Sequence, residues 1–191
     1  MLLIIDAINS IDARGTHGLS CRKNVARQAR HSLLNDLVYR ALAKAGTPSV
    51  KEPSGFFRED GKKPDGVTLI PWINGKCMTW DVTASDTLAP SYLSITSATV
   101  GVAAELAARK KMAKYATLSR SYQFIPIALE SLGPCNADAL AFIREVGRRM
   151  TLVSGDPRET TFLMQSISVI NQRCNATAVS GCFAGLAPGV F

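Results

Sequence analysis

The alternation of apolar and polar positions is most regular between residues 26 and 45. Apolar side chains recur there every three or four residues, which is the spacing of one helical face. Gly46 follows directly, and glycine is common just after the last turn of a helix. The pattern therefore predicts one amphipathic helix over 26–45. Its apolar stripe consists of Leu33, Leu34, Leu37, Val38, Ala41 and Leu42.

Three short segments after this helix have the composition of strands. They are residues 49–57, 65–72 and 76–84, which are rich in β-branched and aromatic side chains. Asn74 and Gly75 stand between the last two segments, and this dipeptide is typical of the tight turn of a β-hairpin. We therefore expect three antiparallel strands with a hairpin turn at Asn74 and Gly75.

The C-terminal half is predicted to contain one more strand and further helices. Residues 96–118 are rich in alanine and are expected to form one long helix. Residues 122–132 are apolar on both faces, which is typical of a central strand. Two more helices are expected, over 137–151 and over 156–175. The Asp-Pro dipeptide at 156–157 suits the start of the second one.

This order of elements predicts a mixed α/β fold around a single sheet. The order is a helix, three antiparallel strands, a helix, a strand and then more helices. We expect an irregular lead-in over 1–24, a core over 25–130, a helical extension over 131–178 and a loose tail over 179–191. The length of 191 residues suits one such domain.

Two aspartates stand at unusual places in the strand segments. Asp65 opens the second segment, and Asp81 lies inside the third, between Trp80 and Val82. A carboxylate among strand residues is costly unless a partner accompanies it. Because a hairpin joins the two strands, both carboxylates can face one point, together with the Val82 carbonyl. Such oxygen ligands suit Mg²⁺ or Mn²⁺, so the pattern predicts a divalent-metal site.

The same residues resemble the PD-(D/E)XK motif of restriction-like nucleases. Lys63-Pro64-Asp65 matches the first half of the motif, and Asp81-Val82-Thr83 matches the second half. The sequence departs from the motif at Thr83, where the motif has a lysine. The resemblance implies a restriction-endonuclease-like core with the order helix, three antiparallel strands, helix and strand.

A closer resemblance includes the following helix, in which Lys111, Lys114 and Tyr115 form a Lys-x-x-Lys-Tyr pattern. With Asp65 and Asp81, this pattern is similar to the restriction-like endonuclease region at the C-terminus of site-specific non-LTR retrotransposon proteins. The resemblance implies that the two aspartates bind the metal. It also implies that Lys111 positions the water or the phosphate, and that Lys114 and Tyr115 support the site.

The resemblance covers about residues 12–130 and includes half of a zinc knuckle. His17 and Cys21 are four residues apart and look like the second half of the knuckle found in that family. No cysteine and no other histidine precedes His17 in the sequence. Because a structural zinc site needs about four ligands, we do not expect this chain to bind zinc.

The distribution of charge indicates a polyanionic partner. The formal net charge is +7, and residues 1–64 carry 11 Lys and Arg against 6 Asp and Glu. A basic region of this kind attracts nucleic acid through its phosphates. The residues expected to contact DNA are Arg27, Arg30, His31, Lys62 and Lys63.

Other features of the sequence bear on the compartment. The five cysteines are odd in number and form no CxxC pair, which fits a reducing environment. The initial apolar run MLLII is too short for a signal peptide, and no apolar run approaches the roughly 18 residues of a membrane span. We therefore expect a nuclear or cytoplasmic protein that is neither secreted nor inserted in a membrane.

Together these features predict a metal-dependent DNA endonuclease that nicks target DNA by phosphodiester hydrolysis. The family resemblance further implies a reverse transcriptase domain encoded upstream, for which the nick supplies a primer. A non-catalytic DNA-binding remnant of a retroelement fits the same residues, because it would keep Asp65 and Asp81. A partner-binding domain that uses the C-terminal helices is a third alternative.

Overall fold

The computed structural model describes residues 3–4, 10–11, 17–20, 25–54 and 63–183. The strands are β1 (Leu3–Ile4), β2 (Ser10–Ile11), β3 (Ser49–Lys51), β4 (Gly66–Thr68), β5 (Met78–Ser85) and β6 (Gln123–Glu130). The helices are α1 (His17–Ser20), α2 (Val25–Lys44), α3 (Pro90–Thr96), α4 (Val102–Lys114), the 3-10 helix η1 (Ala116–Arg120), α5 (Ala137–Ser154) and α6 (Glu159–Phe183). The predicted α/β class is confirmed.

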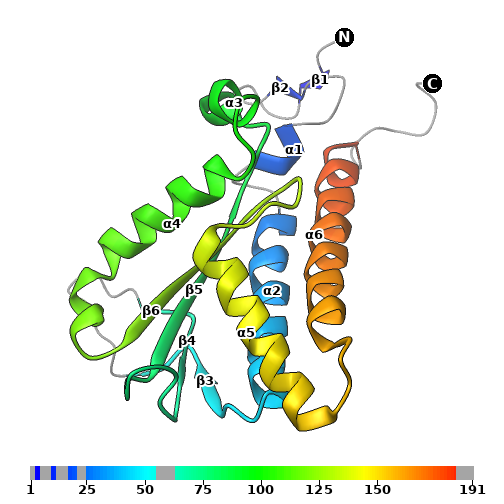
Figure 1. The fold of residues 1–191 in the computed structure, drawn as a ribbon. Coiled ribbons are helices and arrows are strands. Elements are labelled where there is room, and N and C mark those ends of the chain that lie inside the picture. Colours follow the sequence, from blue (N-terminus) through cyan, green and yellow to red (C-terminus); the bar gives the residue numbers. More distant parts are fainter. Residues whose placement is uncertain (1–2, 5–9, 12–16, 21–24, 55–62, 184–191) are drawn as a thin grey trace.

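One four-stranded sheet organises the described part of the chain, with the strand order β3–β4–β5–β6. The first three strands are antiparallel, as the sequence predicts, whereas β6 runs parallel to β5 over its whole length. A parallel pair needs a crossover connection, and the crossover contains α4, which covers one face of the sheet. Helices α2 and α5 cover the opposite face, and α6 packs against both (Figure 1).

The position of β6 differs from the sequence prediction. Among the described strands it lies at the edge of the sheet rather than at its centre. Its residues 124–130 are nonetheless buried, because α4 covers one face of the strand and α5 covers the other. A strand that is apolar on both faces therefore indicates that helices cover both of its faces. It does not indicate that the strand is central in the sheet.

The first two strands of the sheet are shorter than expected, although the hairpin turn is confirmed. Within the described residues β3 ends at Lys51, because Glu52 adopts a positive φ of 46°. β4 covers only Gly66–Thr68 instead of 65–72. Asn74 and Gly75 have φ values of 50° and 72°, the left-handed conformations that a tight type I′ turn requires.

The long helix predicted over 96–118 is wrong, since the chain forms α3, α4 and η1 there. The break lies before α4, where Gly101 has a φ of 81° that favours glycine. The carboxylate of Glu130 then accepts hydrogen bonds from the amides of Ala103 and Ala104, at 2.9 and 3.3 Å. These amides belong to the first turn of α4, where helical donors lack partners within the helix. A residue of β6 thus helps to fix where α4 begins.

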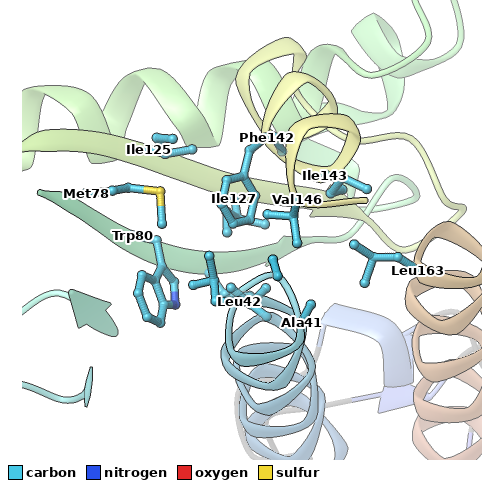
Figure 2. Close-up of a cluster of buried hydrophobic side chains, with 14 of the residues drawn as sticks. Ala41, Leu42, Met78, Trp80, Ile125, Ile127, Phe142, Ile143, Val146 and Leu163 are labelled. Atoms are coloured by element: carbon cyan, nitrogen blue, oxygen red, sulfur yellow. The ribbon is translucent and has the colours of Figure 1, made fainter. Parts of the chain in front are cut away.

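The larger hydrophobic core lies between the sheet and helices α2, α5 and α6. Trp80 is fully buried in it, and its indole nitrogen donates to Asn35 Oδ1 at 2.8 Å. A Cβ atom at Gly66 would lie 2.1 Å from the Trp80 ring, so only glycine permits this contact. Figure 2 shows residues of this core, among them Ala41, Leu42, Met78, Trp80, Ile125, Ile127, Phe142, Ile143, Val146 and Leu163.

The two C-terminal helices share this core with α2 and the sheet. The last helix begins at Glu159, slightly after the predicted start at Asp156 and Pro157, and it runs to Phe183, beyond the predicted end at 175. Asp156 Oδ1 still accepts the amide of Arg158 at 2.9 Å in the turn before the helix. α6 is 25 residues long. No helix in the described ranges combines the length and apolar composition that a membrane crossing requires.

We predict that Glu145 stabilises the fold in a pH-dependent way. Hydrogen bonds from Arg148, and also from Arg149, lower the pKa of Glu145 to about 2, against the opposing effect of burial. Arg149 also stacks on the Trp72 ring at 3.7 Å and donates to the Trp72 carbonyl at 3.1 Å. Glu145→Gln is expected to lower the free energy of unfolding by about 1 kcal/mol at pH 7, allowing for solvent screening.

The sign of the pH dependence follows from the lowered pKa. The stabilisation is fully present above the ordinary glutamate pKa of 4.5 and is lost as the pH falls toward 2. Urea unfolding of the wild type and of Glu145→Gln should therefore show a difference at pH 7 that shrinks at pH 3. A difference of equal size at both pH values would contradict the charge-based explanation.

Candidate active site

Asp65 and Asp81 lie on the same face of the sheet. Gly66 pairs with Trp80 in the antiparallel ladder, which places Asp65 opposite Asp81, and the Asp65 amide donates to the Trp80 carbonyl at 2.9 Å. Residues directly opposite in such a ladder project to the same side. Both aspartates line one cleft of about 960 Å³, formed by residues of α2, β5, α4 and the chain around β4. The structure thus brings together the two carboxylates that the sequence singled out.

Asp81 is 3% exposed and is held by the C-terminal end of α4. The Lys111 ammonium lies 2.5 Å from Asp81 Oδ1, and the Tyr115 hydroxyl donates to Asp81 Oδ2 at 2.8 Å. Lys111 and Tyr115 are four residues apart, so they project from the same side of the helix end. A buried carboxylate needs both a countercharge and hydrogen bonds, and these two side chains supply them.

Asp65 is held in a different way, by the backbone of β5 and by α2. Its Oδ2 accepts the amide of Val82 at 2.6 Å, and its Oδ1 lies 3.4 Å from His31 Nε2. The other ring nitrogen of His31 lies 3.1 Å from the Val82 carbonyl oxygen. The hydrogen bond to Asp65 raises the pKa of His31, which burial opposes and the charges of Asp65 and Asp81 reinforce. A ring protonated on both nitrogens can donate to both oxygens at once.

Tyr115 connects the second aspartate to the segment before β4. Besides Asp81, its hydroxyl contacts the Lys63 carbonyl oxygen at 3.0 Å and accepts a hydrogen bond from the Lys114 ammonium at 2.8 Å. The Tyr115 ring is 1% exposed and packs on Phe124 with 4.7 Å between ring centroids. Tyr115 therefore lies behind the wall of the cleft as a support, while Lys114 lines the cleft.

The residues predicted to contact DNA are not all in the cleft. Arg27, His31 and Lys63 line it, and Lys63 donates to the Glu52 carbonyl at 3.1 Å. Lys62 and Cys21 lie outside the described residues, and the side chain of His17 also lies outside them, although His17 begins α1. The half zinc knuckle therefore stays a prediction.

Arg30 does not line the cleft, so its contact with DNA stays a prediction. Arg30 is 4% exposed, and its guanidinium donates to Asn175 Oδ1 at 2.6 Å, which joins α2 to α6. Burial lowers the pKa of Arg30, although Cys174 and Asp86 partly offset this effect. The guanidinium therefore mainly joins the two helices, although the side chain also lines a hollow beside the cleft. Arg30 lies on the inner side of α2, whereas Arg27, one turn earlier, is exposed.

Sequence reasoning missed Gln28 and Ala84 as parts of the cleft wall. Gln28 lies three residues before His31 on α2, so helical spacing from His31 would have found it. No signal in the sequence marks Ala84, which lines the cleft because β5 continues past its last pair with β4. Thr83, noted as a departure from the motif, also lines the cleft, and its Oγ1 has no hydrogen-bond partner.

The donor set of the cleft fits a hard divalent cation. Mg²⁺ is commonly bound by one or two carboxylates and keeps several waters, so Asp65 and Asp81 suffice, with the Val82 carbonyl nearby. Within the described ranges no group of three or more His, Cys, Asp or Glu side chains is arranged around one point for a metal ion. The side chains that could hold a metal are therefore the two aspartates.

Comparisons with known proteins add no assignment to this geometry. No protein-family model matches the chain, and no curated protein matches it. The likeness to retrotransposon endonucleases accordingly stays a prediction from the motifs.

We predict that the contact between Lys111 and Asp81 is strongly coupled. Lys111→Met would leave the buried Asp81 charge with the Tyr115 hydroxyl alone, and should lower the free energy of unfolding by about 2–3 kcal/mol. In an Asp81→Asn background the same change should cost about 1 kcal/mol, which gives a coupling energy of roughly 1–2 kcal/mol. Urea unfolding of the four proteins measures this coupling.

The matched control for this cycle is Lys110→Met, since Lys110 is the exposed neighbour on the same helix. Its change in unfolding free energy should stay within about 0.5 kcal/mol in both backgrounds. Equal costs of Lys111→Met with and without the Asp81 charge would show that the ion pair is not what positions this helix end.

We also predict that the pKa of His31 lies above the usual value of about 6.5. The chain contains only two histidines, so an NMR titration of the imidazole protons can follow each of them. Asp65→Asn removes the principal cause and should return the pKa of His31 toward its usual value. Because the folded-state pKa is raised, any stability that His31 adds is present below pH 6.5 and is lost as the pH rises through the raised value. A His31 pKa that Asp65→Asn leaves unchanged would contradict this assignment.

Proposed function

We propose that the chain is a metal-dependent DNA endonuclease module that nicks DNA by hydrolysing a phosphodiester bond. The observation that carries the proposal is the meeting of Asp65, Asp81 and Lys111 in one cleft. These side chains come from β5, α4 and the start of β4, and they are separated by 16 and 30 positions in the sequence. The retrotransposon-type motifs noted in the sequence contain the same residues, which supports the proposal.

The charges around the cleft suit a phosphodiester substrate. Arg27, Lys63, Lys111 and Lys114 line its walls together with the two aspartates. The cations would attract the DNA backbone. The carboxylates, which would otherwise repel a phosphate, would face a divalent cation between themselves and the substrate. A bound Mg²⁺ or Mn²⁺ would supply Lewis-acid polarisation of the phosphate and a more acidic water.

The remaining roles in the reaction, which are charge stabilisation and positioning, belong to side chains of the protein. Lys111 is 26% exposed and lies between the buried Asp81 and the open cleft, where its ammonium can stabilise charge that grows on the phosphate oxygens. Tyr115 fixes the second oxygen of Asp81, and His31 fixes Asp65. Asp81, Lys111 and His31 are carried by a strand and two helices, whereas Asp65 and Tyr115 directly adjoin β4 and α4, so regular elements hold or flank all of these groups. Lys111 thereby takes the role of the lysine that the motif has in place of Thr83.

A second candidate is a non-catalytic DNA-binding remnant, and one observation favours it. Both oxygens of Asp81 already have protein partners, Lys111 on one and Tyr115 on the other. The buried carboxylate is therefore satisfied by the chain itself, and a cation would have to share Oδ1 with Lys111. The same basic cleft would then bind DNA without cutting it.

The test is nicking of supercoiled plasmid in the presence of Mg²⁺ or Mn²⁺. We expect the wild type to nick only with metal, and Asp81→Asn, which keeps the shape of the side chain, to reduce nicking at least 100-fold. The control is Asp36→Asn, because Asp36 is an exposed aspartate that pairs with Lys51 outside the cleft. Asp36→Asn should nick as the wild type does.

DNA retardation measured alongside separates the two candidates. Retardation without nicking in the wild type, unchanged in Asp81→Asn, would support the DNA-binding remnant and reject the endonuclease. Equal nicking by the wild type and by Asp81→Asn would show that the cleft is not the source of the activity. A wild type that shows neither retardation nor nicking would reject both candidates.

A further inference from the structure

A second hollow of about 380 Å³ adjoins the cleft. The two share Arg27, Thr83, Ala84 and Lys111 as lining residues, so the hollow continues the cleft along β5. It lies past the last β4 pair, where β5 runs on to Ser85 beside β6 but no described strand pairs with its other edge. Its size is at the small end of ligand pockets, which are roughly 300–1,000 Å³.

The hollow contains a buried acceptor that has no partner. Asp86 is 9% exposed, and its Oδ1 accepts the Leu88 amide and the Ser131 hydroxyl, each at 3.0 Å. Its Oδ2 is buried and has no hydrogen bond. The hydroxyl of Thr83, which lines the same hollow, is likewise buried and unpaired. Leaving such groups unpaired is costly, so the absence of partners calls for an explanation.

Part of the wall of the hollow is aromatic and basic. Tyr92 of α3 and Lys110 of α4 line it, with the Lys110 ammonium 3.3 Å from the Tyr92 hydroxyl and 5.8 Å from the ring centroid. Lys110 and Arg27 are exposed at this wall. Arg30 also lines the hollow, and its Nε is a buried donor without a hydrogen bond. The hollow therefore combines cations, an aromatic ring, an unpaired acceptor, an unpaired donor and an unpaired hydroxyl.

We propose that this hollow holds the nucleotide next to the phosphate in the cleft, and that it selects a base with an exocyclic amino group beside a ring-nitrogen acceptor. The inference rests on the proposed endonuclease function and adds a specificity site to it. Asp86 Oδ2 would accept from the amino group, and the Thr83 hydroxyl would donate to the ring nitrogen. On the Watson–Crick edge, cytosine and adenine carry this pattern, whereas thymine presents the opposite one.

The chemistry of the hollow disfavours a bare anion. A phosphate against Asp86 would meet a second negative charge, whereas an amino group meets an acceptor. Lys110 and Arg27 can still hold the phosphate of the same nucleotide at the rim. The hollow thus suits one whole nucleotide rather than inorganic phosphate alone.

The test is binding of mononucleotides to the full chain, which requires neither metal nor cleavage. Titration calorimetry or amide NMR shifts of residues 83–88 would compare dCMP, dTMP and inorganic phosphate. We expect dCMP to bind at least fivefold more tightly than dTMP, with phosphate weaker than both. Asp86→Asn keeps Oδ1 for Ser131 and Leu88 but replaces the free acceptor by a donor, so the preference should shift toward dTMP.

Two further variants keep the inference open to rejection. Lys110→Gln should weaken both nucleotides alike and leave the preference between them unchanged. Ser91→Trp, at an exposed position of the rim, should block both nucleotides, and it replaces Asp86→Asn as the test if that variant does not fold. Equal binding of dCMP and dTMP, no nucleotide binding, or an unchanged preference in Asp86→Asn would overturn the inference.

The two proposals fail independently. Plasmid nicking without a preference among mononucleotides would reject the base-selective hollow and leave the endonuclease intact. A dCMP preference in a protein that does not nick would reject the endonuclease and keep the hollow as a base-binding site. A map of nick positions in the active protein should then show cytosine or adenine enriched at one position beside the cut.

Discussion

The position of α4 against the sheet depends on two buried carboxylates, one at each end of the helix. Glu130 of β6 accepts the amides of Ala103 and Ala104 at its start, and Asp81 of β5 binds Lys111 and Tyr115 at its end. Between these ends the apolar contact is small, since it consists of alanines: Ala104, Ala107, Ala108 and Ala128. Alanine buries little apolar area, so the polar contacts at the two ends contribute more than usual to the stability of this packing. The negative charge at the helix start and the cation in its last turn also match the helix dipole.

This arrangement makes Lys111 a rigidly placed cation. A lysine on a solvated helix face would move through many rotamers, but the contact with Asp81 selects one of them. Strand residues hold both ends of α4: Glu130 contacts its first turn, and Asp81 contacts Lys111 and Tyr115 at its end. The sheet therefore determines where the helix lies and where Lys111 is placed. The same ion pair that stabilises the fold therefore places the ammonium at the wall of the cleft. Structure and candidate chemistry depend here on one contact.

Features encoded by neighbouring residues were predictable from the sequence, and features set by distant residues were not. The helix over 26–45 and the Asn74–Gly75 turn follow from local spacing and from a φ preference. The break before α4 has a local signal in Gly101, but the contact of Glu130 with the first turn of α4 comes from about 30 positions away and has none. Burial of Arg30 likewise depends on Asn175 of α6. The two aspartates were predicted because a carboxylate inside a strand is itself a local anomaly, whatever surrounds it.

The cleft lies where β4 begins, since β4 starts only at Gly66 and Asp65 lies just before it. Beyond Trp80 no described strand pairs with this edge of β5, so its amide and carbonyl groups need other partners. Asp65 accepts the Val82 amide, and His31 contacts the Val82 carbonyl, so two side chains take the place of the missing strand. A neighbouring strand would have filled this space with backbone. A carboxylate and an imidazole satisfy the same backbone groups without filling the space. They leave a path open along β5 as far as Asp86, and ionisable side chains line the start of that path.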